Sequence, residues 1–268
     1  MADKLPENYR IERYILKRLL GKGSFGCIYE AVHMDTAERV AIKIENVSVK
    51  YPQLKWEAKV YSEQAKIAGS IVPEIYWFGT VDRYTVLIME KLGLPLGREL
   101  PVPIANMNDI ARQMLDRIRS LHQSGFIHRD IKPENFLVKG NTIYLIDMGL
   151  AKRYMQQGRH IPFGKGKHLV GTPRYASINN HRGDELSRRD DIESIAYVLI
   201  YLALGRLPWQ NIPKTNGFKQ EIMAKKVTIS APVLCKQLPE AFLSFLQASR
   251  KLGFEEEPRY SEYIEWFK

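Results

Sequence analysis

Residues 127–135 bring together three polar side chains whose types suit the transfer of a phosphoryl group. Asp130 precedes Lys132 by two positions and Asn135 by five. A carboxylate can orient or deprotonate a hydroxyl nucleophile, an ammonium can neutralise the moving phosphoryl group, and a carboxamide oxygen can bind Mg²⁺. A second carboxylate suited to Mg²⁺, Asp147, ends the apolar run 143–146. The spacing therefore predicts a phosphotransferase site.

Each of these residues also has an ordinary structural explanation when it is taken alone. Asp130 could belong to a turn, Asn135 could cap a helix, and Asp147 could simply end a strand. The order in which they occur, together with the motifs described next, favours the phosphotransferase interpretation.

A glycine-rich segment lies between two predicted strands. It reads Gly21, Lys22, Gly23, Ser24, Phe25, Gly26. Glycines let backbone N–H groups approach phosphate oxygens without obstruction from a Cβ atom. The pattern alone is also typical of a hairpin turn or a dinucleotide-binding loop. The dinucleotide interpretation needs a helix directly after the glycines, whereas residues 27–32 have the composition of a strand.

Lys43 lies on the next predicted strand, in the apolar run 40–44. A lone lysine on a strand is usually a solvated surface residue. Beside a glycine loop, however, Lys43 could hold nucleotide phosphates while Glu57, on the following helix, holds Lys43. Glu63 shares that helix, and Glu57 is preferred because of its setting in residues 56–61.

Hydrophobic periodicity divides the chain near Gly93 into a strand-rich part and a helix-rich part. In the first part we expect strands over 9–20, 27–33, 39–44, 75–80 and 84–89 and a helix over 52–67. In the second part we expect helices over 104–125, 191–204 and 240–252. Residues 150–190 are polar and basic. A loop of that length inside a compact domain is usually functional or disordered, and we favour the functional interpretation.

The charge balance favours anionic partners. Lys and Arg total 40 and Asp and Glu total 30, which gives a formal net charge of +10. The partners could be nucleic acid, anionic lipid, nucleotide or acidic protein, and charge alone does not choose among them. The basic residues are spread through the chain, which argues against a disordered basic tail.

Other features limit the cellular setting. We expect no signal peptide, because residues 1–10 are charged, and no membrane span, because the longest nearly uncharged run, 194–205, is too short. Cys27 and Cys235 do not suggest a disulfide framework or a zinc site. Two free thiols are typical of a reducing compartment, so we expect a cytoplasmic or nuclear location.

Later motifs narrow the assignment. The chain carries His160-Ile161-Pro162, the runs 171–179 and 187–194, and Leu207-Pro208-Trp209-Gln210. Within 171–179, Ser177-Ile178-Asn179 stands where protein kinases usually have Ala-Pro-Glu. With these, the chain resembles the casein kinase 1 family of eukaryotic serine/threonine protein kinases over about residues 9–267. Met148 replaces the usual Phe after the metal-binding aspartate, and apolar packing should survive that change.

The resemblance implies an α+β, two-lobed protein-kinase fold with ATP between the lobes. A small, mainly β N-lobe with one key helix would span 1–93, and a larger helical C-lobe would span 94–268. The implied catalytic residues are Asp130, Lys132, Asn135, Lys43 and Glu57, with Asn135 and Asp147 holding Mg²⁺. The implied ATP-binding residues are Leu20, Gly21, Lys22, Gly23, Ser24, Phe25, Gly26, Cys27, Ile28, Ala41, Lys43, Met89, Glu90 and Leu92.

The resemblance also implies roles for residues around the substrate. Met89 would be the gatekeeper, Thr172 would bond the catalytic loop and favour serine or threonine hydroxyls, and Asp191 would tie down the backbone of that loop. Asp191 could equally be an ordinary helix cap.

Family members phosphorylate residues that lie three positions after a phosphorylated or acidic residue. The anion site for such substrates would be Arg174 with Lys167 and Lys165, because an arginine fork can bind an anion bidentately. These charges could instead merely solvate a loop. The family's second anion ligand, a lysine after the Pro-Trp-Gln run, has no certain counterpart in Lys214 or Lys219.

Three other functions are less well supported. A pseudokinase scaffold would lack a catalytic residue, and none is missing. A nucleic-acid-binding module would explain the charge but needs base-reading motifs that do not occur. A small-molecule kinase is disfavoured by residues 171–179 and by the expected basic groove, both of which favour a polypeptide substrate. We therefore expect protein substrates, no requirement for DNA or RNA, and a monomer.

Overall fold

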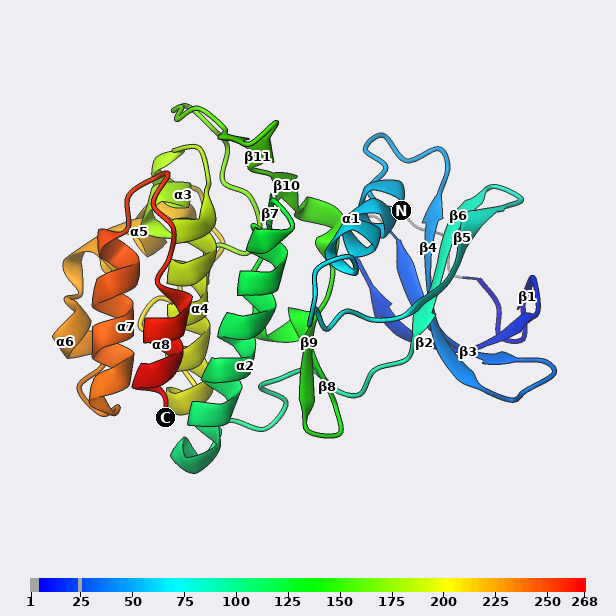
Figure 1. Ribbon diagram of the computed structural model, residues 1–268, viewed down its shortest axis with the longest axis horizontal. Helices are drawn as coiled ribbons and strands as arrows, with labels where there is room; N and C mark the ends of the chain where they lie inside the picture. The colour runs from blue at the N-terminus through cyan, green and yellow to red at the C-terminus, as the bar shows by residue number, and fades with distance from the viewer. Residues whose placement is uncertain (1–4, 24–25) are drawn as a thin grey trace. The chain divides into compact units, whose positions relative to one another are not determined.

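The computed structural model describes residues 5–23 and 26–268, which divide into two compact units. The first unit runs to Gly93 and includes Ile146–Gly149. The second consists of Leu94–Leu145 and Leu150–Lys268 (Figure 1). The short segment Ile146–Gly149 therefore interrupts the second unit in sequence but belongs to the first.

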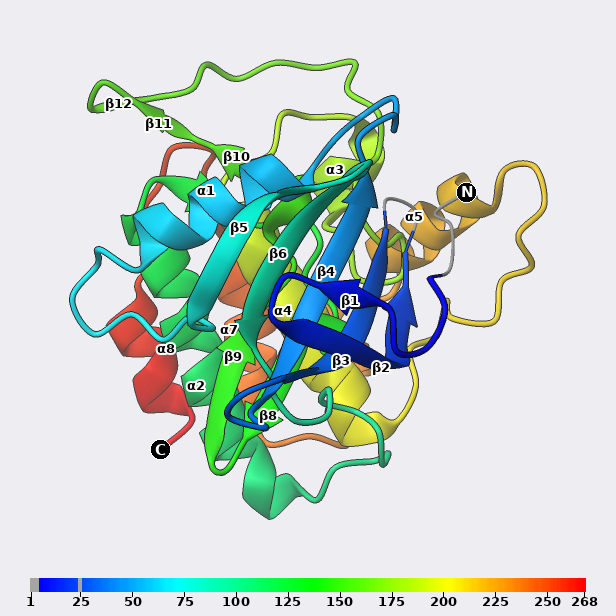
Figure 2. The same ribbon diagram turned by 90° about the vertical axis from the view of Figure 1, so that its right-hand side faces the viewer.

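A six-stranded antiparallel sheet dominates the described part of the first unit. Its strands are β1 (Arg10–Ile11), β2 (Tyr14–Lys22), β3 (Cys27–His33), β4 (Arg39–Asn46), β5 (Ile75–Val81) and β6 (Tyr84–Glu90). They are ordered β1-β2-β3-β4-β6-β5 (Figure 2). The strand expected over 9–20 is divided, because the chain reverses at Glu12 with a φ of 52° so that Ile11 pairs with Tyr14.

The sheet is held together by a core of alternating apolar side chains. Val40, Ile42 and Ile44 of β4 are all buried, and they pack in one cluster with Tyr29 and Ala31 of β3. Alternate residues of a strand face the same side of a sheet, so this spacing places one side of β4 in the core. Lys43, between Ile42 and Ile44, points to the other side.

Helix α1 (Leu54–Gln64) buries one face with helical spacing. Its buried residues are Leu54, Glu57, Val60, Tyr61 and Gln64. The helix begins two residues later than expected, because the Glu45 carboxylate accepts hydrogen bonds from the N–H groups of Gln53 (2.9 Å) and Leu54 (3.3 Å). A carboxylate at this end also complements the helix dipole. A buried glutamate, Glu57, requires a charged partner.

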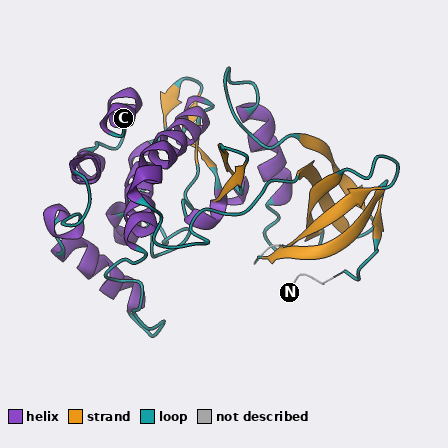
Figure 3. Ribbon diagram, turned by 90° about the horizontal axis from the view of Figure 1, so that it is seen from below, coloured by secondary structure: helices purple, strands orange, loops and turns teal. Residues whose placement is uncertain are grey.

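The second unit is mainly helical. Its helices are α2 (Ile104–Gln123), α3 (Ile178–Arg182), α4 (Arg188–Leu204), α5 (Phe218–Thr228), α6 (Ala231–Leu234), α7 (Glu240–Lys251) and α8 (Tyr260–Trp266) (Figure 3). Helix α4 is buried along nearly its whole length and packs against α2 and α7. It begins before Asp191, because the side chain of Asp190 accepts a hydrogen bond from the N–H of Ser187 at 2.8 Å. The predicted α+β class is confirmed.

The sequence analysis missed the short helices α3 and α6, and it also missed α5 and α8. The buried residues of α5 are only Ile222 and Lys226, so it carries no continuous apolar stripe. Helix α8 has a single pair of buried tyrosines, Tyr260 and Tyr263. Neither helix has the repeated spacing on which a prediction from periodicity depends.

Two segments of the second unit lie next to the candidate catalytic residues in the sequence. A hairpin of β8 (Phe136–Lys139) and β9 (Thr142–Leu145) joins Asn135 to the strand end that precedes Asp147. Residues 150–190 are largely irregular, as expected, although they contain β10 (Lys152–Arg153), β11 (Met155–Gln156) and β12 (Arg159–His160) besides α3. Strand β10 pairs with β7 (Phe126–Ile127). Strand β7 ends three residues before Asp130.

Across the residues that the structure describes, we find no helix with the length and apolar character needed to cross a membrane.

Gly26, directly before β3, is expected to be sensitive to substitution. An added Cβ would collide with the backbone carbonyl oxygen of Ile44. We expect Gly26→Ala to lower the free energy of unfolding by about 1–3 kcal/mol, measured by urea denaturation. Gly21→Ala is the control, because no atom lies within 4 Å of its added carbon. Equal destabilisation by both changes would contradict this account.

Candidate functional site

Lys43, Glu57 and Asp147 form a charged cluster within the first unit. The Lys43 Nζ lies 2.6 Å from Glu57 Oε2 and 2.8 Å from Asp147 Oδ1. The Glu57 side chain is 2% exposed, that of Lys43 18%, and that of Asp147 40%. The ammonium therefore lies between a buried carboxylate and one that reaches solvent. Glu63 points elsewhere and pairs with Lys66.

The electrostatics of this cluster keep Lys43 charged. Burial alone would lower the pKa of Lys43, but the two carboxylates outweigh burial and hold that pKa above its ordinary value. Burial raises the pKa of Glu57, and Lys43 offsets part of that increase. A cation held in place by a buried carboxylate is suited to bind phosphate oxygens.

Tyr61 supports the same cluster from α1. Its hydroxyl accepts a hydrogen bond from the backbone N–H of Asp147 at 3.0 Å. Asp147 has a φ of 67°, a left-handed conformation that costs a non-glycine residue about 1–3 kcal/mol. Glu57 and Tyr61 lie one turn apart on α1. Tyr61 thus fixes the backbone of Asp147, and Glu57 fixes Lys43, which contacts the Asp147 carboxylate. The sequence analysis missed Tyr61, although its spacing from Glu57 was a usable signal.

The described residues of the glycine segment are hydrogen-bonded at the ends of β2 and β3. Gly21 pairs with Ile28 and Lys22 with Cys27, and the Gly23 N–H donates to the Gly26 carbonyl at 2.9 Å. Ser24 and Phe25, which we predicted to contact ATP, lie outside the described residues.

Several predicted nucleotide-contacting residues meet on β4 and β6. Ala41 pairs with Met89 across the two strands, and Met89 is buried. The N–H of Glu90 donates to the Glu74 carbonyl at 2.8 Å, and Leu92 is buried just beyond β6. Leu20, on β2, is instead 44% exposed.

Asp130 is the centre of a second cluster, within the second unit. Its Oδ2 accepts a hydrogen bond from Lys132 Nζ at 2.5 Å, and its Oδ1 accepts one from Thr172 Oγ1 at 2.7 Å. Asn135 Nδ2 donates to the Asp130 backbone carbonyl at 2.9 Å. Both carboxylate oxygens of Asp130 therefore have a partner that fixes the orientation of the carboxylate. The hydrogen bond from Thr172 also connects the loop that carries Asp130 to residues 171–172.

Gly171 explains how Thr172 approaches so closely. Its φ is 77°, and an added Cβ would collide with the Arg129 carbonyl oxygen and lie 3.0 Å from Asp130 Oδ1. Only glycine fits this backbone approach.

A buried carboxylate, Asp191, anchors the backbone of the same loop. It accepts hydrogen bonds from the N–H groups of His128 (2.7 Å) and Arg129 (2.9 Å), and it lies 3.0 Å from His122 Nε2. Burial favours a higher pKa for Asp191, but the hydrogen bonds and nearby histidines outweigh burial and lower that pKa. Arg129 has a φ of 70°, so the anchor holds a strained residue next to Asp130.

The predicted Mg²⁺ ligands provide oxygen atoms of the kind that this ion prefers. Asp147 contributes a partly exposed carboxylate, and Asn135 contributes a carboxamide whose nitrogen is already used toward the Asp130 carbonyl. Among the described residues, no group of three or more His, Cys, Asp or Glu side chains could hold a metal ion.

The predicted substrate-anion residues have different surroundings. The Arg174 guanidinium lies 5.7 Å from the ring centres of both Tyr175 and Tyr201. Lys167 Nζ lies 3.6 Å from Glu185 Oε2. The other carboxylate oxygen of Glu185, Oε1, pairs with Lys152 Nζ at 2.7 Å. Lys165 is exposed.

A buried lysine that the sequence analysis missed supports the backbone around Arg174. Lys226 is fully buried, and its Nζ donates to the carbonyls of Pro173 (2.9 Å) and Ala176 (2.5 Å). Trp209 Nε1 donates to the Arg174 carbonyl at 2.8 Å. Nothing in the sequence around Lys226, which directly follows another lysine, distinguished it from a surface lysine.

A family model described as "Protein kinase domain" matches residues 14–257 of the chain. All the residues of the two clusters fall within this range.

Asp191 should contribute stability that depends on pH. Asp191→Asn leaves a backbone N–H of the loop without its acceptor, and we expect the free energy of unfolding to fall by about 1–3 kcal/mol at neutral pH. Because the folded pKa of Asp191 is lowered, its contribution is present above the unfolded value of about 3.9 and is lost as pH falls through the folded pKa. Urea denaturation at several pH values tests this.

The matched control is Asp109→Asn, on the exposed side of α2. That change should have an effect within about 0.5 kcal/mol. A destabilisation by Asp191→Asn that did not shrink in acid would contradict the assigned role of its charge.

Proposed function

The chain belongs to the protein kinase family, and we propose that within it the protein is a serine/threonine kinase of the casein kinase 1 type. As a family member it is an ATP-binding transferase that phosphorylates proteins. The proposed substrates carry acidic or already phosphorylated residues before the acceptor, and the proposed metal is Mg²⁺.

The observation that carries the proposal is the fixed Asp130 carboxylate. Asp130 accepts the proton of the substrate hydroxyl as the hydroxyl oxygen bonds to the γ-phosphorus of ATP. The bond from that phosphorus to the β,γ-bridging oxygen breaks, and ADP leaves. Lys132, 2.5 Å from Asp130 in the structure, is placed to neutralise charge on the transferred group.

The Lys43 ammonium is the proposed ligand of the nucleotide phosphates. Its contact with the buried Glu57 fixes its position, and its raised pKa keeps it cationic. Asn135 and Asp147 would hold Mg²⁺, which when bound neutralises phosphate charge.

The preference for serine and threonine is inferred from Thr172. Its hydroxyl contacts the same carboxylate that would receive the substrate proton. In the casein kinase 1 family, which the surrounding residues 171–179 resemble, this threonine accompanies hydroxyl substrates of the serine and threonine type.

The preference for anionic substrates is inferred from Arg174. Its backbone carbonyl is fixed by Trp209, and its flanking carbonyls, those of Pro173 and Ala176, are fixed by Lys226. An arginine held in this way can bind a phosphate with two parallel hydrogen bonds. The net charge of +10 attracts acidic proteins in general.

Asp130→Asn tests the catalytic role directly. Asparagine keeps the shape and can still bond Thr172 but cannot accept the proton, so we expect kcat to fall by about 10²- to 10⁴-fold. Phosphate transfer to a serine peptide and the urea unfolding midpoint are measured together. Asp184→Asn, on the same unit, is the control for the loss of one carboxylate. Full turnover in Asp130→Asn would exclude the proposed role.

Arg174→Ala tests the anion site. We expect KM for a peptide with phosphoserine three residues before the acceptor to rise about tenfold or more, because a charge-assisted bidentate contact is lost. KM for the same peptide with alanine at that position should change little. Arg182→Ala, an exposed arginine on the same unit, is the control. Equal effects on both peptides would remove Arg174 from substrate recognition.

A further inference from the structure

A buried histidine of α2, His122, lies between Asp191 and helix α8. The His122 side chain is 1% exposed, and that of Asp191 is 3% exposed. His122 Nε2 lies 3.0 Å from Asp191 Oδ2, and His122 Nδ1 lies 2.6 Å from the hydroxyl oxygen of Tyr260, the first residue of α8. Helix α8 packs against α2 within the second unit (Figure 1). Three helices, α2, α4 and α8, therefore meet at one imidazole ring.

The surroundings of these three side chains determine their protonation states. Burial lowers the pKa of His122, so its ring is neutral at pH 7. Burial acts to raise the pKa of Asp191, but hydrogen bonds from His122 and from the loop outweigh burial, so Asp191 is a carboxylate. Burial raises the pKa of the Tyr260 hydroxyl, which therefore keeps its proton.

One arrangement of protons gives each of these polar atoms a suitable partner. A neutral imidazole has one N–H and one lone pair, and a carboxylate can only accept hydrogen bonds. The N–H of His122 is therefore at Nε2 and donates to Asp191. The lone pair is at Nδ1, and the Tyr260 hydroxyl donates to it. Tyr260 thus supplies the donor that a buried imidazole nitrogen requires.

Asp191 connects this imidazole to the loop that carries Asp130. Its Oδ2 accepts hydrogen bonds from His122 and from the backbone N–H of His128, and its Oδ1 accepts one from the N–H of Arg129. Asp130 directly follows these two residues, and its own N–H donates to His128 Nδ1 at 3.2 Å. The carboxylate orientation that serves the loop is therefore coupled to the orientation of the His122 ring.

A second tyrosine fixes the backbone of His122 but not its ring. The Tyr154 hydroxyl donates to the His122 carbonyl at 2.8 Å. Arg188 holds Tyr154 in turn, with its guanidinium 5.0 Å from the centre of the tyrosine ring and a hydrogen bond of 2.7 Å to the Glu255 carbonyl. With the backbone held in this way, the contact with Tyr260 decides how the imidazole is oriented toward Asp191.

We propose that Tyr260 is a positioning residue for phosphate transfer, acting on Asp130 through the ring of His122. The inference rests on the proposed catalytic role of Asp130. The residues proposed to bind the nucleotide phosphates and the substrate anion belong to other clusters. Loss of the Tyr260 hydroxyl is therefore expected to slow the transfer step and to leave the binding of both substrates largely unchanged.

Tyr260→Phe tests the proposal, because it keeps the ring and removes only the donor. We expect kcat for a serine peptide to fall about five- to tenfold, with KM for ATP and for the peptide within about twofold, since a misplaced base slows the chemical step without removing a binding contact. The control is Tyr263→Phe, which removes the hydroxyl of another buried tyrosine of α8 and should keep kcat. Urea unfolding midpoints of both variants are measured alongside.

Two measurements follow the same contacts without phosphate transfer. Nitrogen NMR of the His122 ring should show a neutral imidazole with its proton on Nε2, and Tyr260→Phe should shift the Nδ1 resonance to that of a nitrogen that accepts no hydrogen bond. Hydrogen exchange of the His128 and Arg129 amides should become about tenfold faster in Tyr260→Phe. Tyr263→Phe should leave both signals unchanged.

A double variant tests whether the effect passes through the imidazole. His122→Phe keeps a ring at this position and removes both nitrogens, so it also lowers kcat. Adding Tyr260→Phe to His122→Phe should then change kcat by less than about twofold, because the hydroxyl no longer has a nitrogen to hold. If His122→Phe does not fold, the exchange and NMR measurements on Tyr260→Phe still decide the question.

Three outcomes would overturn the proposal. Tyr260→Phe could retain native kcat and native amide exchange, or it could lose no more kcat than Tyr263→Phe. The two effects could also be additive in the double variant, which would place the action of Tyr260 outside His122. A native chain that transfers no phosphate, with the exchange and NMR results as expected, would instead contradict the catalytic role of Asp130 and leave the contacts among Tyr260, His122 and Asp191 established.

Discussion

The contact between Lys43 and Glu57 is the constraint on which the first unit depends. It places two opposite charges in a nearly dry position and joins β4 to α1, and through Asp147 it also joins a segment that lies 104 residues further along the chain. Removing one partner of such a buried pair typically destabilises a protein by about 3–5 kcal/mol. The cost arises because one charge would be left buried without its partner, so the contact between Lys43 and Glu57 ties α1 to β4.

In the second unit, an ion pair with Lys132 and several hydrogen bonds together hold Asp130 in place. Asp191 holds the backbone before Asp130, Thr172 and Lys132 hold its carboxylate, and Gly171 permits the close approach. Every one of these contacts orients Asp130, and the left-handed Arg129 is kept in place by the anchor beside it. A carboxylate that is fixed before substrate binds requires little reorganisation during the reaction, which is how preorganised sites accelerate chemistry.

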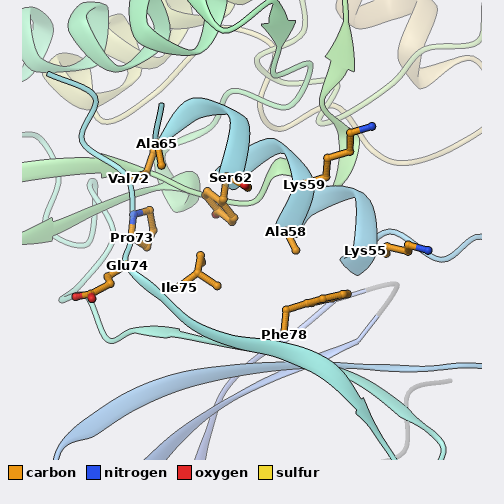
Figure 4. A pocket seen from close by; sticks show the side chains of 11 residues that line it. Lys55, Ala58, Lys59, Ser62, Ala65, Val72, Pro73, Glu74, Ile75 and Phe78 are labelled. Atoms are coloured by element: carbon orange, nitrogen blue, oxygen red, sulfur yellow. The ribbon is translucent and has the colours of Figure 1, made fainter. Parts of the chain in front are cut away.

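Much of the fold could be predicted because strong periodicity marks β3, β4, β6, α2 and α7. The setting in residues 56–61 favours Glu57 over Glu63, and in the structure Lys43 contacts Glu57 whereas Glu63 pairs with Lys66. Helix α5 could not be predicted, since Ile222 and Lys226 are its only buried residues. The role of Lys226 depends on carbonyl groups that are about 50 positions away, and no local pattern contains that information. The same holds for the 640 Å³ pocket of the first unit, which is lined by α1, residues 72–74 and β5 and so depends on segments that are separate in the sequence (Figure 4).

The central claim is that the protein transfers phosphate to protein hydroxyls and prefers substrates that carry an anionic group before the acceptor. The most direct measurement is transfer from ATP and Mg²⁺ to two serine peptides, one with phosphoserine three residues before the acceptor and one with alanine there. The account predicts transfer to both, with a marked preference for the phosphorylated peptide in kcat/KM. Equal transfer to the two peptides would be consistent with kinase activity but would contradict the anion site. No transfer by a chain that still binds ATP would contradict the central claim.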